Sequence, residues 1–101
     1  MKLYKTKDKS GNIWITKDKA GLIPHCATAP AYIKANSSLK TWWLNGKRHR
    51  IGGPAIEDGQ SVSYWIDGKY YSDYSLYEKD ALIFKKFNKN DIGDVINILN
   101  V

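Results

Sequence analysis

The fold is decided by two stretches, Thr41-Trp42-Trp43-Leu44-Asn45-Gly46 and Ser63-Tyr64-Trp65-Ile66-Asp67-Gly68. Each ends in a dipeptide that a two-residue type I′ turn favours, because both central positions need positive φ. Each begins with aromatic, aliphatic and hydroxyl side chains, which are typical of a half-buried strand. The two stretches therefore predict two equivalent β-hairpins.

The similarity extends outward from the hairpins. Pro30-Ala31-Tyr32-Ile33 precedes the first hairpin and Pro54-Ala55-Ile56-Glu57 precedes the second, so one unit is written twice between Pro30 and Tyr71. A period in the low twenties indicates a repeated supersecondary unit. Repetition of this kind usually builds a surface and seldom an active site.

A third, degenerate unit is predicted at the N-terminal end. Ile13-Trp14-Ile15 matches Tyr64-Trp65-Ile66, and His25 precedes Pro30 by the spacing with which His49 precedes Pro54. The tip of this unit is expected at residues 17–21, and residues 2–6 are expected to pair with 13–16 as an opening hairpin. Residues 2–71 thus read as an antiparallel meander.

Alternation along a strand places Trp43 on one face and Trp42 with Leu44 on the other. One face should be core and the other a candidate contact surface. Because Trp43 and Trp65 precede equivalent turns, both are predicted to be buried at equivalent positions.

The pattern becomes helical after Tyr71. Ser72, Asp73 and Ser75 are candidate N-caps for a helix over 76–87 with one apolar stripe. Asn90 or Asp91 caps a second segment, in which apolar residues recur at helical spacing: Ile92, Val95, Ile96 and Leu99. The predicted fold is α+β, with a meander of repeated hairpins followed by two C-terminal helices packed on the sheet.

Length and composition narrow the class of protein. A chain of 101 residues is expected to be a single domain over 1–101, with hairpin repeats at 1–71 and a helical tail at 75–100. One cysteine, Cys26, cannot form an internal disulfide, and no apolar run has the length of a membrane span. We therefore expect a cytoplasmic protein with no membrane partner. Its net charge of +6 suits an acidic or polyanionic partner, although the lysines are spread along the chain.

The stretch from Asn45 to Glu57 resembles the repeat N-G-K-x-H-R-x-x-G-P-A found in short proteins of A/T-rich bacteriophages and large DNA viruses. That repeat is itself loosely similar to variant MORN repeats. The resemblance covers about residues 41–71 and ends where Tyr70-Tyr71-Ser72 replaces Arg48-His49-Arg50. It implies a β-hairpin repeat and a phage origin, in which case the location is the host bacterial cytoplasm. It brings no catalytic residues.

Catalysis requires a base, a nucleophile and an orienting group within reach of one another. The candidates are His25, Cys26 and His49 with the acids Glu57 and Asp58. His25 and Cys26 are neighbours whose side chains diverge in an extended segment, and His49 lies between two arginines. The same set lacks zinc-ligand spacing. We therefore expect no enzyme activity, no cofactor and no metal.

The binding residues are predicted around the two hairpins. Cations beside aromatic rings can contact a protein or stack on single-stranded nucleic acid. The candidates are Trp42, Lys47, Arg48, His49, Arg50, Tyr70 and Tyr71. A structural alternative is that the two arginines pair with Glu57, Asp58 or Asp67 and hold neighbouring repeats in register.

These features favour a small non-enzymatic binding protein that inhibits or redirects a host protein or complex by covering its surface. Anti-defence activity against a restriction, CRISPR-type or toxin component is one form of this, and binding of a transcription factor is another. The alternative is a nucleic-acid-binding protein that uses a basic and aromatic hairpin face.

Overall fold

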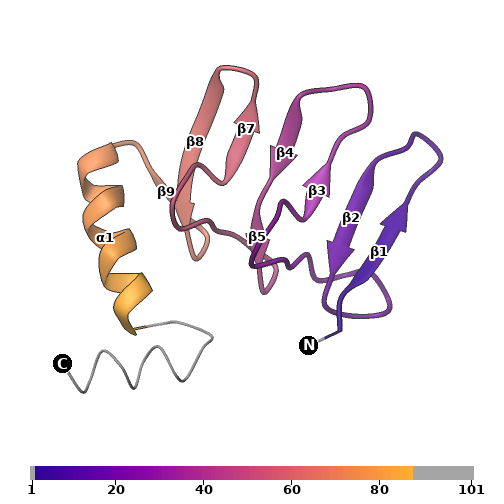
Figure 1. Cartoon of the computed structure of the whole chain (residues 1–101), viewed down its shortest axis with the longest axis horizontal. Coiled ribbons are helices and arrows are strands. Elements are labelled where there is room, and N and C mark those ends of the chain that lie inside the picture. The colour runs from indigo at the N-terminus through magenta and orange to yellow at the C-terminus, as the bar shows by residue number, and fades with distance from the viewer. Residues whose placement is uncertain (1, 88–101) are drawn as a thin grey trace.

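The computed structural model describes residues 2–87, which form nine strands and one helix (Figure 1). In chain order they are β1 (Tyr4–Lys7), β2 (Ile13–Thr16), β3 (Tyr32–Ile33), β4 (Leu39–Thr41), β5 (Trp43–Leu44), β6 (Lys47–Arg48), β7 (Ile56–Asp58), β8 (Ser61–Ile66), β9 (Lys69–Tyr71) and α1 (Tyr74–Phe87). All strand pairs are antiparallel. The α+β class and the meander of hairpins are therefore confirmed.

Three units stand side by side in a row that ends at α1 (Figure 1). Each unit contains one long central segment, 13–17, 39–45 or 61–67, that runs from an upper turn to a lower turn. In the second and third units the preceding strand pairs with the upper half of this segment and the returning strand with its lower half. In the first unit β1 pairs with the whole of β2, and the returning chain makes one bridge, Thr16 with Pro24. Adjacent units are joined in the upper half by β2 with β3 and by β4 with β7.

The backbone hydrogen bonds confirm a third unit at the N-terminal end but correct its register by two residues. The Ile15 amide donates to the Ala31 carbonyl as the Trp42 amide donates to the Ala55 carbonyl, and Ile15 accepts from His25 as Trp42 accepts from His49. Ile15 is thus equivalent to Trp42 and Tyr64. Trp14 is equivalent to Thr41 and Ser63, and not to Trp65 as the matching sequence letters suggest.

The two predicted type I′ turns are present. Asn45 and Gly46 have φ of 52° and 78°, and Asp67 and Gly68 have φ of 49° and 83°. A residue with a branched or bulky side chain would be strained at these angles. The turn residues therefore fix where each long segment reverses, and with it the register of the strands that follow.

The helix covers one face of the sheet, which we call the helix face. Tyr64 and Ile66 of β8 pack with Tyr77 and Ala81 of α1 in the main apolar cluster. Trp65, between them in the sequence, points to the opposite face, which we call the open face.

The assignment of the tryptophans to the core is corrected by these faces. Trp43 and Trp65 are equivalent, as predicted, since their indole N–H groups donate to Thr41 Oγ1 and Ser63 Oγ. Both lie on the open face and are only partly buried. Trp42, predicted as an exposed contact residue, is 9% exposed on the helix face. The reason is that α1 and the chain crossings cover only one side of a single sheet layer.

Helix α1 begins two residues before the predicted start at 76, and one of the three candidate N-caps is confirmed. Asp73 Oδ1 accepts hydrogen bonds from the Ser75 and Leu76 amides, which makes Asp73 the N-cap. The basic residues Lys85 and Lys86 lie in its last turn, where they complement the helix dipole. The predicted second helix over 91–100 lies outside the described residues. Within residues 2–87 the one helix is too short and too polar to cross a membrane.

Candidate binding surface

A histidine joins each unit to the next. His25 Nδ1 accepts a hydrogen bond from the Asn45 amide, and His49 Nδ1 accepts one from the Asp67 amide, both at 2.9 Å. The second residue of each turn donates to the carbonyl of the residue before the histidine, Gly46 to Pro24 and Gly68 to Arg48. Each lower turn is therefore held by the preceding unit, and both histidines are buried.

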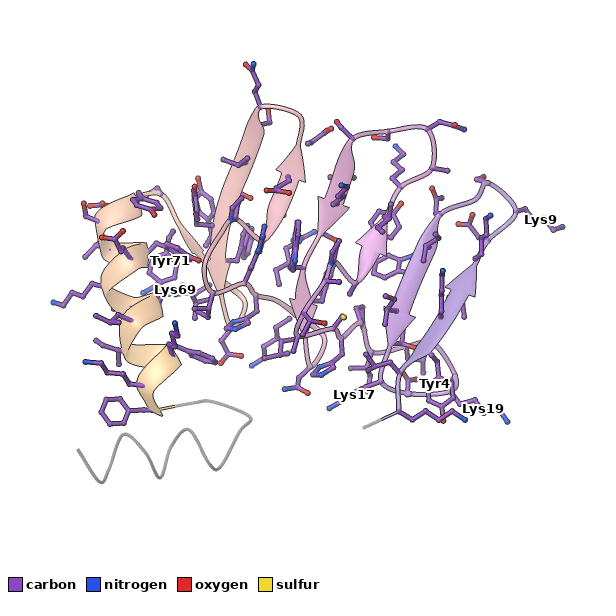
Figure 2. All side chains as sticks on the ribbon, in the orientation of Figure 1. Tyr4, Lys9, Lys17, Lys19, Lys69 and Tyr71 are labelled. Atoms are coloured by element: carbon purple, nitrogen blue, oxygen red, sulfur yellow. The ribbon has the colours of Figure 1, made fainter. Side chains whose placement is uncertain are left out.

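The last unit has no following turn to hold, and its equivalent position is Tyr71. The Tyr71 hydroxyl donates to Asp80 Oδ2 at 2.7 Å, and Lys69 lies 4.9 Å from its ring. Figure 2 shows Lys69 and Tyr71 beside α1. Burial, and then the bond and charge of Asp80, raise the pKa of Tyr71 to about 12. The departure from the repeat pattern at Tyr71 thus replaces a contact between units by a contact with the helix.

Acid is expected to destabilise the array through these histidines. Burial lowers the pKa of His25 and of His49; Lys17 adds to the effect at His25, whereas Asp67 opposes it at His49. A lowered folded-state pKa means that the unfolded chain binds more protons once the pH falls below about 6.5. The stabilisation is then complete above that pH and is lost below it, by up to about 1.4 kcal/mol per pH unit for each histidine.

Urea unfolding between pH 7.5 and pH 4.5 measures this loss. The aspartates with lowered pKa, Asp8 and Asp18, owe the shift first to hydrogen bonds from Asn12 and from the Leu22 amide. These aspartates contribute to the loss of stability only when the pH falls below about 4. A His25→Gln, His49→Gln variant should lose the pH dependence between 4.5 and 6.5. An unchanged slope in that variant would contradict the assignment.

Arg50 stabilises the crossing between two units. Its guanidinium carbon lies 3.9 Å from the Trp42 ring centroid, and Nη1 donates to the Pro54 carbonyl at 3.1 Å and to Glu57 at 3.4 Å. A Cβ on Gly53 would lie 2.8 Å from the guanidinium carbon, so this position requires glycine unless Arg50 moves. For Arg50, the geometry supports the alternative that this arginine pairs with an acidic residue and holds neighbouring repeats in register.

The open face carries a continuous line of aromatic side chains with one arginine in it. We call it the aromatic row; in spatial order it consists of Tyr32, Trp14, Trp43, Arg48, Trp65 and Tyr70. The ring centroids of Trp14 lie 4.3 Å from Tyr32 and 6.1 Å from Trp43. At the other end, Trp65 and Tyr70 are 5.4 Å apart. The row spans all three units, because its members come from β2, β3, β5, β6, β8 and β9.

Arg48 bridges two units at the centre of the row. Its guanidinium carbon lies 5.1 Å from the Trp43 ring and 5.2 Å from the Trp65 ring, within the range of a cation–π interaction. Trp43 is its cross-strand partner in the same unit, whereas Trp65 belongs to the next unit. Arg48 therefore contributes to the packing between units and also lies on the open face.

The structure divides the seven predicted binding residues. Trp42, His49 and Arg50 face the helix side and make contacts within the fold, and Tyr71 packs against α1. Arg48 and Tyr70 belong to the aromatic row, and Tyr70 is 53% exposed. Lys47 is exposed at the lower turn, 3.9 Å from Asp67.

Sequence reasoning missed four members of the row: Trp14, Tyr32, Trp43 and Trp65. Strand alternation separates the two faces, but it does not say which face the helix covers. The cross-strand pair of Trp14 with Tyr32 depends on how β2 and β3 meet, across a crossing of irregular sequence. One signal was available: Trp43 and Trp65 hold equivalent positions in the repeat, so they had to lie on the same face.

The candidate chemical groups are engaged within the fold. The Nδ1 atoms of both histidines are occupied by turn amides, and the thiol of Cys26 is buried 3.9 Å from the Thr28 hydroxyl. Among residues 2–87, no three His, Cys, Asp or Glu side chains cluster as metal ligands do. Comparisons with protein-family models, with curated proteins and with solved structures found no match to this chain.

Proposed function

We propose that this protein is a non-enzymatic binding module that covers a surface of a host protein with its open face. The observation that carries the proposal is the aromatic row, a line of rings across three units on the face that α1 leaves uncovered. Tyrosine and tryptophan provide large contact area at a small loss of conformational entropy, and together with arginine they dominate the energetics of protein interfaces.

Rigidity of the row supports this function. Its rings contact one another or Arg48, and Trp43 and Trp65 are also held by hydrogen bonds to strand hydroxyls. A surface that is ordered before binding loses little entropy when a partner docks. The resemblance to repeats of bacteriophage and large-virus proteins supports a bacterial host protein as the partner, bound for anti-defence or host takeover.

A matched pair of substitutions tests the proposal. Tyr70 lies on the open face, and Val62, 46% exposed, lies on the helix face of the same sheet beyond the helix. Affinity capture from a bacterial lysate with mass spectrometry should recover a protein with the parent and with Val62→Ser, and lose it with Tyr70→Ser. Equal recovery by both variants at parental melting temperatures would contradict use of the open face.

Nucleic-acid binding is the second candidate, favoured by the net charge of +6. Binding through several phosphates weakens steeply as salt rises, because counterions are released. We expect weak binding, since Lys5, Lys7 and Lys40 face the helix side and Arg48 is the one cation in the aromatic row. Titration of labelled single- and double-stranded DNA and RNA at two salt concentrations measures it. Tight, steeply salt-dependent binding would favour this candidate instead.

A further inference from the structure

We propose that Arg48 is an anchor that recognises a carboxylate, an Asp or Glu side chain, on the partner protein. The inference rests on the proposed binding function and assigns a chemistry to the centre of the aromatic row. The charge and hydrogen-bonding capacity of Arg48 are incompletely used within the described residues, whereas those of Arg50, two residues away, are used.

Two indole rings contact the guanidinium of Arg48. The two indoles lie at 5.1 and 5.2 Å from its central carbon, and they come from β5 and β8. Contact with two rings restricts the rotation of the long side chain. A fixed, planar guanidinium loses less entropy for each hydrogen bond that it forms with a ligand.

The hydrogen-bond donors of the Arg48 guanidinium are not all paired within residues 2–87. Arg48 Nε is buried and has no hydrogen-bond partner among residues 2–87, and no carboxylate in that part of the chain lies within 4.0 Å of the guanidinium. Arg50, in contrast, donates to a carbonyl and pairs with Glu57. A buried donor without an acceptor costs free energy. A carboxylate approaching from the open side supplies charge and acceptors in the geometry that the arginine fork matches.

The contacts within the aromatic row favour a protein carboxylate over a nucleic-acid phosphate as the ligand of Arg48. Single strands are held by bases that stack on free ring faces and by several cations along the backbone. In the row, the Trp14 ring packs against Tyr32 at a tilt of 39°, and the Trp43 and Trp65 rings contact Arg48. These contacts occupy ring faces that bases would need, and Arg48 is the row's single cation. One acidic side chain among apolar neighbours therefore fits better than a chain of phosphates.

The experiment begins with selection of random 12-residue peptides that bind the full chain. We expect the enriched peptides to carry Asp or Glu at one fixed position beside apolar residues. Changing that acid to its amide should weaken binding about tenfold or more, because a charge-assisted hydrogen bond is lost. The same loss is expected in the protein variant Arg48→Gln. Lys40→Gln, which removes the same charge from the other face, should bind as the parent does.

A spectroscopic readout on the parent protein does not depend on the folding of any variant. The sequence holds only two arginines, Arg48 and Arg50, so NMR of labelled protein shows two arginine Nε–H signals. The acidic peptide should shift the signal of Arg48 and leave that of Arg50 in place. The signals of the tryptophan indoles report whether Arg48→Gln keeps the fold.

The outcomes separate the two proposals. Peptides that need Tyr70 but share no acid would overturn the carboxylate assignment and leave the binding function intact. If none of the enriched peptides requires the open face for binding, both proposals are overturned. A 12-nucleotide single-stranded DNA that shifts the Arg48 signal when acidic peptides do not would assign the site to phosphate and overturn the carboxylate.

Discussion

Replacing Tyr77 by alanine is expected to remove a large part of the free energy of unfolding at 25 °C. Its side chain is 3% exposed, and its ring packs against Tyr64 and Tyr71 of the sheet. Its hydroxyl lies 2.7 and 2.8 Å from the Arg50 and Gly53 carbonyls and accepts from the Gly53 amide. Loss of a buried aromatic ring costs about 3–5 kcal/mol. A domain is stable by only about 5–15 kcal/mol, so urea unfolding should show a large drop in the denaturation midpoint.

Two further variants show how much of the lost stability comes from the hydroxyl of Tyr77 and how much from the burial of its ring. Tyr77→Phe keeps the ring and leaves the two carbonyls without this donor, so a loss of about 1–3 kcal/mol is expected. Tyr74→Ala removes a ring of the same kind that is 54% exposed on the same helix, and it should cost much less. If Tyr77→Ala and Tyr74→Ala unfold at the same urea concentration, α1 does not hold the sheet through Tyr77.

Trp42→Ala is expected to have the second large effect, again about 3–5 kcal/mol. The indole is 9% exposed and supports the guanidinium of Arg50, which in turn is bound to the Pro54 carbonyl and to Glu57. Removing the ring opens a cavity on the helix face and releases the crossing between the second and third units. Thermal and urea unfolding measure the change.

The adjacent residue provides the control. Trp43 has the same side chain but lies partly exposed on the open face. Trp43→Ala removes less buried area, so it should destabilise the fold less than Trp42→Ala does. It should also weaken binding of any partner that docks on the aromatic row. The reverse order of stabilities would show that the two faces have been assigned wrongly.

The hairpins could be predicted from the sequence because their determinants are local. Asn45-Gly46 and Asp67-Gly68 adopt the positive φ that a type I′ turn needs at both positions, and Asp73 caps α1 through its own side chain. The equivalence of Trp43 with Trp65 followed from their distance to these turns. Each of these features depends on a few consecutive residues, so the sequence pattern was enough.

The faces could not be predicted, because they depend on contacts between distant segments. Trp42 and Trp43 are equally apolar, and Trp42 is the buried one because the crossing that carries Arg50 lies on its face of the sheet. The function of His49 also appears only when the lower turn of the next unit reaches it. The histidine in the repeat pattern reads as a candidate base or contact residue until that amide is seen.

The histidine contacts give the array a direction of growth. Each unit supplies the acceptor for the unit that follows, so a duplicated copy of residues 31–54 inserted after position 54 would bring its own histidine and meet a turn at each junction. Such a duplication would also add another tryptophan and arginine to the open face. No copy could be added after Tyr71 without displacing α1, which occupies that end of the row. The length of the binding surface can therefore vary by internal duplication, while the helix marks a fixed end.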